Sequence, residues 1–344
     1  MQIRAGRAAV ILLLLLGTIG GSTTSGRAQS SMATQPTMRV GYFANITHAQ
    51  AVLGFGDGAF TKGLAGVTVR PTIFGAGPDE LNAIFAGAID IGYIGPGPAI
   101  NGFVRSHGGV VIVAGAANGG SLLVARAGTG IKTVKDLAGK TVAIPQLGNT
   151  QDILLRSLLV TAGLKPSANG GSVRIIAVTN ADTLTLFKKK NLDAALVPEP
   201  WGSQLVALTG ATVVLDWQQI YGGTTPSTVI VASASFLKAH PDLVVRFLRV
   251  HDQLTTQLQQ ARGHTSAVTT ALNTQIKVLT GAALSPSVLA SALTRTTFTT
   301  AISQPTLTQF AAFSVESGYL KQGVSLTGLV ATWPLAHLHD ASIK

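Results

Sequence analysis

The segment Ile89–Pro98 has the sequence IDIGYIGPGP, and a helical pattern, AINGFVRS, follows it directly at residues 99–106. The apolar residues predict a short buried strand, and the Gly-Pro-Gly-Pro run predicts a sharp turn after it. A helix that begins just beyond a strand leaves its first backbone N–H groups without partners inside the helix. Because such groups carry partial positive charge, this arrangement favours binding of an anion beyond the end of the strand.

The same order of elements occurs twice in the chain. Asp90 follows Val40 by 50 residues, and Asp193 follows Val142 by 51 residues. Each half runs strand, turn, helix, strand, turn, helix, short apolar strand, proline-rich turn and helix. This alternation predicts parallel βαβ units in two lobes with a cleft between them. Ligands of such sheets bind beyond the carboxyl ends of the strands, so six turns should surround one cavity: 44–48, 75–79, 94–98, 146–151, 179–182 and 198–201.

The rest of the chain is predicted to return to the first lobe. A strand at 228–232 is followed only by helical patterns, which provide no further sheet. We therefore assign residues 38–128 and 228–344 to lobe 1 and residues 129–227 to lobe 2. The chain then crosses between the lobes twice, near 127–131 and near 222–229, and two crossings form a hinge.

The amino-terminal residues are typical of an export signal. Arg4 and Arg7 precede an apolar run at Val10–Leu16, and small residues continue to Ala28. This pattern predicts a signal peptide at 1–28, followed by a linker at 29–37, and hence a periplasmic protein. The apolar run is too short to span a bilayer. The chain contains no cysteine, so a lipid-anchored cysteine, disulfides, cysteine-bound zinc and a thiol nucleophile are excluded.

Composition and charge exclude several classes of function. Hydrophobic residues make up 46% and charged residues 11% of the chain, which indicates a large core. The net charge of +11 falls to +8 once the three arginines of residues 1–28 are removed. The one dense basic cluster, Lys188–Lys190, lies at a predicted helix end, so no nucleic-acid partner is expected. No spacing typical of catalytic triads, paired carboxylates or metal ligands occurs, so we expect no enzyme activity, no cofactor and no metal.

Several segments together resemble the periplasmic substrate-binding proteins of ABC importers, in the branch for aliphatic sulfonates, taurine and nitrate. They are VGYFANITHA (40–49), AGAIDIGYIGPGPAI (86–100), GIKTVKDLAGKTVAIPQLGNTQD (130–152), DTLTLFKKKNLDAALVPEPW (182–201) and FLKAHPDLVVRFL (236–248). The resemblance covers residues 38 to beyond 320. It implies an α/β fold of the type II periplasmic-binding-protein class, with two βαβ lobes around a central cleft and a two-crossing hinge.

The resemblance also implies a function and partners. It implies a monomer that captures a small anionic organic ligand by hinge closure and delivers it to a membrane permease with its ATPase. The alternatives are a nitrate, bicarbonate or phosphonate binder, a binder of a thiamine-pyrimidine precursor, and an enzyme similar to the pyrimidine synthases of this fold. The synthases use a cysteine-rich motif that this chain lacks. Ala44 departs from the family pattern, which often has proline there.

Candidate ligand contacts in the first lobe lie in two turns. One turn provides a hydroxyl, an amide and an imidazole where the first strand meets a helix, although Thr47 could simply cap that helix. The other is the Gly-Pro-Gly-Pro turn with the tyrosine before it. The candidates are Asn45, Thr47, His48, Tyr93, Gly95, Pro96 and Gly97.

The first group of candidates in the second lobe lies at a glycine turn before a helix. This turn offers a hydroxyl and the free N–H groups of the helix start, and these donors suit a sulfonate or phosphonate oxygen. The carboxylate of Glu199 would repel an oxyanion, so it should accept from an ammonium group or hold Trp201. Asp182 has helix capping as its simpler role. The candidates are Gly148, Asn149, Thr150, Gln151, Asp182, Glu199 and Trp201.

Overall fold

The IDIGYI segment forms β3 (Ile91–Ile94), a fully buried strand near the middle of a mixed sheet. The computed structural model describes residues 35–220, 222, 224–261 and 265–343. The predicted signal peptide, residues 1–28, and residues 29–34 of the predicted linker lie outside the described residues.

The first sheet has six strands in the order β11-β4-β10-β3-β1-β2. Strands β1, β2 and β3 are parallel, as the βαβ pattern predicts, whereas β10 runs antiparallel to both β3 and β4. The strands are β1 (Thr37–Tyr42), β2 (Thr68–Ile73), β3, β4 (Val110–Gly119), β10 (Pro226–Ser233) and β11 (Thr296–Phe298). The strand predicted at 228–232 therefore joins the first sheet, as expected.

The second sheet repeats this order with five strands, β7-β6-β8-β5-β9. Strands β6, β7 and β8 are parallel, and β5 is antiparallel to β8 and β9. The strands are β5 (Ser121–Ala125), β6 (Thr141–Ile144), β7 (Arg174–Ala177), β8 (Ala194–Pro198) and β9 (Thr212–Leu215). Each sheet thus has three parallel strands joined to an antiparallel strand, and the predicted α/β fold with two sheets is confirmed.

The matched aspartates at the strand starts perform the same structural task in both sheets. Asp90 accepts a hydrogen bond from the backbone N–H of Arg39 (2.8 Å), and Asp193 accepts one from the N–H of Thr141 (2.9 Å). Each carboxylate also pairs with an arginine, Arg39 or Arg126. These contacts give both aspartates a structural role.

The chain passes from the first sheet to the second earlier than predicted. Strand β4 ends at Gly119 and β5 begins at Ser121, so Ser121–Ala125, placed in lobe 1 by the predicted boundary at 128/129, pairs in the second sheet. Gly119 and Gly120 have φ of 73° and 65°, which lets the backbone leave one sheet and enter the next without a loop. The second passage lies between β9 and β10. The N–H of Gly119 donates to Thr225 O (2.9 Å), so the two passages are joined.

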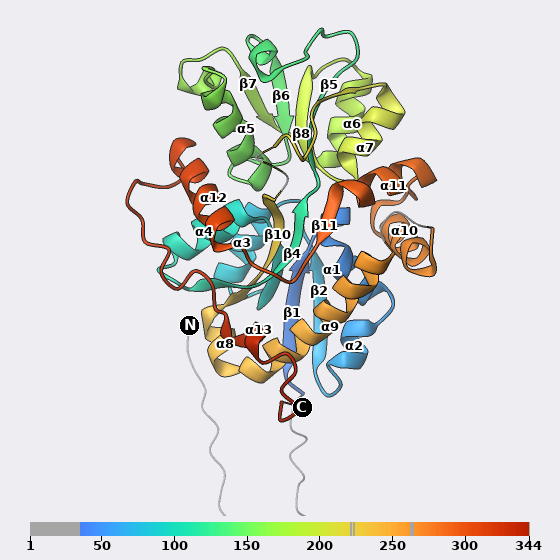
Figure 1. Cartoon of the computed structure of the whole chain (residues 1–344), viewed down its shortest axis with the longest axis vertical. Helices are drawn as coiled ribbons and strands as arrows, with labels where there is room; N and C mark the ends of the chain where they lie inside the picture. The colour runs from blue at the N-terminus through green and yellow to red at the C-terminus, as the bar shows by residue number, and fades with distance from the viewer. Residues whose placement is uncertain (1–34, 221, 223, 262–264, 344) are drawn as a thin grey trace, which may run out of the picture. The chain divides into compact units, whose positions relative to one another are not determined.

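Helices cover both sheets (Figure 1). The helices of the first half are α1 (Ala49–Gly56), α2 (Ala59–Gly63), α3 (Gly77–Phe85) and α4 (Pro96–Arg105), and those of the second half are α5 (Thr150–Thr161), α6 (Asn180–Lys188) and α7 (Trp201–Thr209). The later helices are α8 (Ala234–Ala239), α9 (Pro241–Gln260), α10 (Ala267–Thr280), α11 (Pro286–Arg295), α12 (Gln304–Glu316) and α13 (Trp333–Ala336). Short 3-10 turns are η1 (Ile46–His48), η2 (Val134–Leu137) and η3 (Ser167–Asn169).

Helix α12 connects the two halves by packing. It lies against α4 on one side and α5 on the other (Figure 1). Helix α5 starts where predicted because the Oδ1 atom of Asn149 accepts the N–H of Asp152 (2.9 Å). No helix among the described residues is both long enough and apolar enough to cross a membrane.

Candidate functional site

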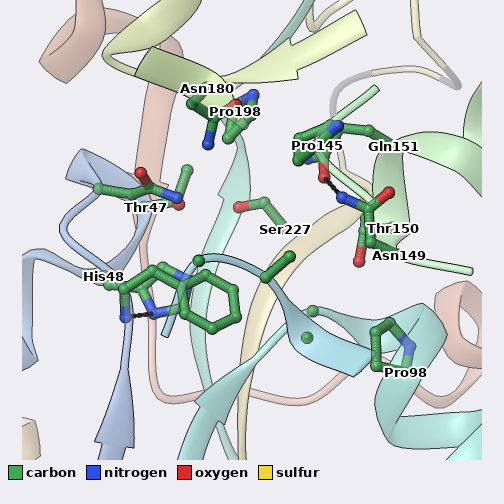
Figure 2. Close-up of a pocket in the computed structure, with 16 residues that line it drawn as sticks. Thr47, His48, Pro98, Pro145, Asn149, Thr150, Gln151, Asn180, Pro198 and Ser227 are labelled. Atoms are coloured by element: carbon green, nitrogen blue, oxygen red, sulfur yellow. Dashed lines mark hydrogen bonds between the residues drawn. The ribbon is translucent and has the colours of Figure 1, made fainter. Parts of the chain in front are cut away.

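A small cavity lies between the two sheets and receives residues from all six of the predicted turns (Figure 2). Its volume is about 20 Å³, which is room for a single small chemical group. The lining residues are Phe43, Asn45, Thr47, His48, Gly75, Ala76, Gly77, Gly95, Pro98, Pro145, Asn149, Thr150, Gln151, Asn180, Pro198 and Ser227. The carboxyl ends of the parallel strands of both sheets therefore meet at one cavity, as expected for this topology.

The start of α5 provides the polar wall on the second-sheet side. Thr150 is the first residue of this helix, and its buried Oγ1 atom has no hydrogen-bond partner among the described residues. The neighbouring side chains are held in place, because Asn149 Nδ2 donates to Gln151 Oε1 (3.2 Å) and Gln151 Nε2 donates to Ser121 Oγ (3.1 Å). A fixed wall with one unused hydroxyl at a helix start is arranged to meet a ligand.

His48 provides a neutral imidazole on the first-sheet side. Its Nδ1 atom accepts the backbone N–H of Phe43 (3.3 Å), and its ring lies 4.3 Å from the Phe43 ring. Complete burial lowers the pKa of His48 to about 3, so the ring is uncharged at neutral pH. With Nδ1 acting as acceptor, the proton of the neutral ring is on Nε2, which makes this nitrogen a donor.

Three further helices begin at the cavity. Gly77 starts α3, Asn180 starts α6, and Gly95 precedes the first residue of α4. Together with α5, their positive ends converge on the same space. The Oδ1 atom of Asn180 is buried and has no partner among the described residues. The cavity therefore combines four helix ends with two unused side-chain polar atoms.

The described residues that line the cavity include no arginine, lysine, aspartate or glutamate. Any charge on a ligand would therefore be met by backbone dipoles, hydroxyls and amides. Such groups stabilise a buried anion when they are already oriented towards it. The electrostatics of the cavity favour an anion of low charge.

Direct hydrogen bonds join the two sides around the cavity. The N–H of Ile46 donates to Glu199 O (3.1 Å), and the indole Nε1 of Trp201 donates to Asn45 Oδ1 (2.8 Å). At another edge, Gln146 Nε2 donates to Asp79 Oδ1 (2.9 Å). The structure therefore shows the two halves in contact around the cavity.

Gly95 allows α4 to approach α5 closely. A Cβ atom at position 95 would lie 1.9 Å from Thr150 Oγ1 and 3.1 Å from Thr150 Cβ. The backbone at Gly95 has φ −69° and ψ 152°, a conformation open to every residue. Glycine is thus required at this position by the approach of the second half and not by backbone geometry.

Some predicted site residues of the first half lie beside the cavity without lining it. Tyr93 is fully buried, and its hydroxyl hydrogen-bonds to His251 Nδ1 (2.9 Å), so it belongs to the core beneath the site. Pro96 and Gly97 are within α4, and the residues of this turn that line the cavity are Gly95 and Pro98. Helix geometry explains the difference, because successive residues of the first helical turn point in different directions.

Four predicted residues of the second half support the site from outside. Asp182 takes part in capping α6, since its N–H donates to Thr179 Oγ1 (3.2 Å), and Gly148 donates to Asp152 (2.8 Å). Trp201 holds Asn45, as described above. The buried carboxylate of Glu199 accepts the N–H (3.0 Å) and hydroxyl (2.8 Å) of Ser203.

Glu199 also meets an arginine from the first half. Arg295 Nη1 lies 3.6 Å from Glu199 Oε1, and its Nε lies 3.4 Å from Asp216 Oδ2. Burial nevertheless raises the pKa of Glu199 to about 7, against the opposing effects of Ser203 and Arg295. The sequence predicted that Glu199 either accepts from an ammonium ligand or holds Trp201. In the structure, the partners of its carboxylate are Ser203 and Arg295.

Three lining residues lie outside the six predicted turns: Phe43, Pro145 and Ser227. Phe43 and Pro145 directly follow β1 and β6, so extending each turn by one residue towards its strand would have included them. Ser227 belongs to β10, which enters the first sheet from a distant part of the sequence. No local pattern in the sequence marks that serine. Within the described residues, no cluster of histidine, aspartate and glutamate could hold a metal ion.

Residues 31–273 match the model of the NMT1-like family. The chain belongs to this family. Two related sequences support the match. A Brucella abortus protein named as a binding protein is 29% identical over 229 residues, which is 65% of this chain and 67% of that protein. An Escherichia coli protein named for binding aliphatic sulfonates is 30% identical over 211 residues, 60% of this chain and 62% of that protein.

Solved structures share the fold at low sequence identity. The alkanesulfonate-binding protein SsuA of Xanthomonas axonopodis pv. citri, bound to MOPS, has a TM-score of 0.72 and 20% identity over 87% of this chain and 100% of its own. The periplasmic nitrate-binding protein NrtA of Synechocystis PCC 6803 has a TM-score of 0.74 and 15% identity over 89% and 88%. The chain therefore shares the mixed α/β fold of these binding proteins, and its own described residues form two sheets.

Proposed function

We propose that this NMT1-like chain is the solute-binding component of an ABC-type importer. It captures a small organic oxyanion of the aliphatic sulfonate type between its two lobes and delivers it to a membrane permease and its ATPase. The predicted signal peptide supports export to the periplasm. The protein acts by binding and carries out no chemical step on its ligand.

The observation that carries this proposal is the unused hydroxyl of Thr150 at the start of α5, inside a cavity without charged side chains. A buried hydroxyl without a partner costs free energy, which a ligand oxygen within hydrogen-bond reach would offset. Helix starts and the neutral His48 provide further donors around the same space. Donors of this kind suit the oxygens of a sulfonate head group.

Contacts across the cavity support closure of the two lobes. Ile46 and Glu199, and Asn45 and Trp201, are hydrogen-bonded across a space of about 20 Å³, and breaking these bonds would widen the entrance for a ligand. The lobes must part by bending at the two passages, between β4 and β5 and between β9 and β10. Ligand binding then favours the closed state by adding contacts that exist only when both lobes are present.

Nitrate is the second candidate ligand. The small volume of the cavity favours it, since nitrate has three oxygens and no organic body. The fold neighbour NrtA is named for nitrate, and SsuA for alkanesulfonates, so the fold accommodates both types of solute. A thiamine precursor would need stacking surfaces, and among the described lining residues only Phe43 and His48 have rings of that kind.

A thermal-shift panel tests the proposal. The chain beginning at residue 29 is mixed separately with methanesulfonate, taurine, longer alkanesulfonates, nitrate, bicarbonate, phosphonates and thiamine precursors. Binding to the folded state raises the unfolding temperature, and the rise grows with the logarithm of the ratio of ligand concentration to Kd. We expect the largest shifts with alkanesulfonates. A shift with nitrate alone would replace the preferred ligand by the second candidate, and no shift with any oxyanion would refute the proposed ligand class.

A further inference from the structure

A second cavity of about 190 Å³ adjoins the candidate site. Pro98 lines both cavities. Two pairs of consecutive residues are also divided between the two cavities. Gly77 lines the candidate site and Pro78 lines the second cavity. Asn149 lines the candidate site and Gly148 lines the second cavity. The two cavities are therefore neighbours that share Pro98 as a lining residue.

The walls of the second cavity differ from those of the first. Pro78, Leu81, Pro98 and Leu147 provide apolar surface, and the Tyr319 ring contributes a further wall. The Tyr319 hydroxyl donates to Asp152, which fixes the ring in position. Leu147 is 52% exposed, an unusual state for a leucine beside a cavity. An apolar ligand group in this cavity would cover part of the exposed Leu147 side chain. Removal of both apolar surfaces from water would favour its binding.

Asn101 provides a polar point inside this apolar cavity. Its side chain is 8% exposed, and its Oδ1 atom has no hydrogen-bond partner among the described residues. A buried amide oxygen without a partner indicates a group that is satisfied by something other than the protein chain. Arg105 lies at the same cavity with its guanidinium 5.9 Å from the centre of the Phe85 ring.

We propose that the second cavity is a binding subsite for the organic body of the ligand whose oxyanion head occupies the candidate site. This inference rests on the proposed function and deepens it. The ligand class is then an alkanesulfonate, or similar oxyanion, with an apolar body longer than two carbons. The body passes Pro98 when the lobes are apart and is enclosed when they close.

The two cavities divide recognition between them. The first cavity, with about 20 Å³, accommodates the head group and excludes a bulky body, whereas the second has the volume for a chain or a small ring. A hydroxyl or amine on the organic body of the ligand would donate a hydrogen bond to Asn101 Oδ1. Nitrate would leave this subsite without a ligand group, so the subsite distinguishes the preferred ligand from the second candidate.

The test compares methanesulfonate, which has the head alone, with hexanesulfonate by isothermal titration calorimetry. Each added methylene buried in an apolar subsite strengthens binding severalfold. We therefore expect hexanesulfonate to bind at least about tenfold more tightly. The substitution Leu147→Trp, which fills the cavity from its exposed edge, should abolish that difference and leave the affinity for methanesulfonate within about twofold.

Leu208→Trp is the matched control, because Leu208 is 54% exposed and lies on α7 outside both cavities. It should leave both affinities unchanged. Methanesulfonate binding with no preference for hexanesulfonate, or a preference that survives Leu147→Trp, would overturn the subsite alone. Failure of both sulfonates to bind the unaltered chain would overturn the proposed function, and the subsite with it.

Discussion

At the scale of single residues, Thr150 connects the fold to the proposed ligand. Its position at the first turn of α5 places a hydroxyl at the positive end of a helix, and packing across the cavity removes that hydroxyl from water. A hydroxyl paired within the protein would contribute nothing to recognition. The missing partner is therefore what distinguishes Thr150 from an ordinary capping residue.

Replacing Thr150 by valine removes this hydroxyl and keeps the shape of the side chain. Loss of a hydrogen bond to a charged ligand costs about 1.5–3 kcal/mol, so the affinity for an alkanesulfonate should fall about 10- to 100-fold. Calorimetric titration measures the change. Thr161→Val, at the exposed end of the same helix, is the control and should leave the affinity unaltered. Equal affinities for the two variants would exclude Thr150 from the site.

Glu199 makes the free energy of unfolding of the protein depend on pH. Its pKa is raised to about 7 by burial, from about 4.5 in the unfolded chain, so the folded state holds the proton more tightly. The contribution of this group is present below pH 4.5 and is lost as the pH rises through 7. The loss is on the order of 3 kcal/mol at pH 8 relative to pH 4. Urea unfolding of Glu199→Gln should show a flatter dependence in this window; a wild-type slope in the variant would assign the effect to other groups.

At the scale of elements, the site is built by the approach of helix starts from two sheets. Helices α3 and α4 come from the first sheet, and α5 and α6 come from the second. The separation between α4 and α5 is set by Gly95, whose hydrogen faces Thr150. This contact leaves no room for a Cβ atom at residue 95 and should be sensitive to a single added carbon.

Gly95→Ala should keep the lobes apart. The added Cβ would collide with Thr150 when they close, while the φ and ψ of residue 95 remain suitable for alanine. We expect alkanesulfonate affinity to fall at least about tenfold. The unfolding temperature of the ligand-free variant should change little, which separates a closure defect from a folding defect. Binding as tight as that of the unaltered chain would show that this approach does not govern closure.

Much of this arrangement follows from local sequence. Strand and helix patterns predicted the six turns, because apolar periodicity and turn residues act over a few positions. The predicted lobe boundary at 128/129 differs from the structure, in which Ser121–Ala125 pairs in the second sheet. This apolar run carries no local signal for either sheet, and it follows two glycines in left-handed conformation. Likewise, Ser227 and the partners of Tyr93 and Glu199 depend on residues far along the chain, which no local pattern reveals.

In the whole molecule, the two sheets have matching strand orders. In the first sheet β10 is the antiparallel strand beside β3, and in the second sheet β5 is the antiparallel strand beside β8. Each of these two strands is the first strand after a passage of the chain between the sheets. The passages are hydrogen-bonded to each other at Gly119 and Thr225. Bending at this joined pair would move one sheet, with its helices, as a body. Helix α12, packed on both α4 and α5, must slide or follow during that motion.

Small-angle scattering should detect this motion. If the ligand is captured by closure, as we propose, the ligand-free population includes open molecules. We expect the radius of gyration to decrease when an alkanesulfonate is added, and to stay larger for Gly95→Ala under the same conditions. Identical scattering profiles for the unaltered chain with and without a saturating ligand would contradict closure by hinge bending.

The lining of the cavity, which has no charged side chain among the described residues, should bind an oxyanion by backbone and hydroxyl donors. Calorimetric titration of the chain beginning at residue 29 with hexanesulfonate measures this binding. We predict one site per chain and a dissociation constant in the micromolar range or tighter. The absence of any binding heat at millimolar hexanesulfonate, over a range of temperatures, would contradict it.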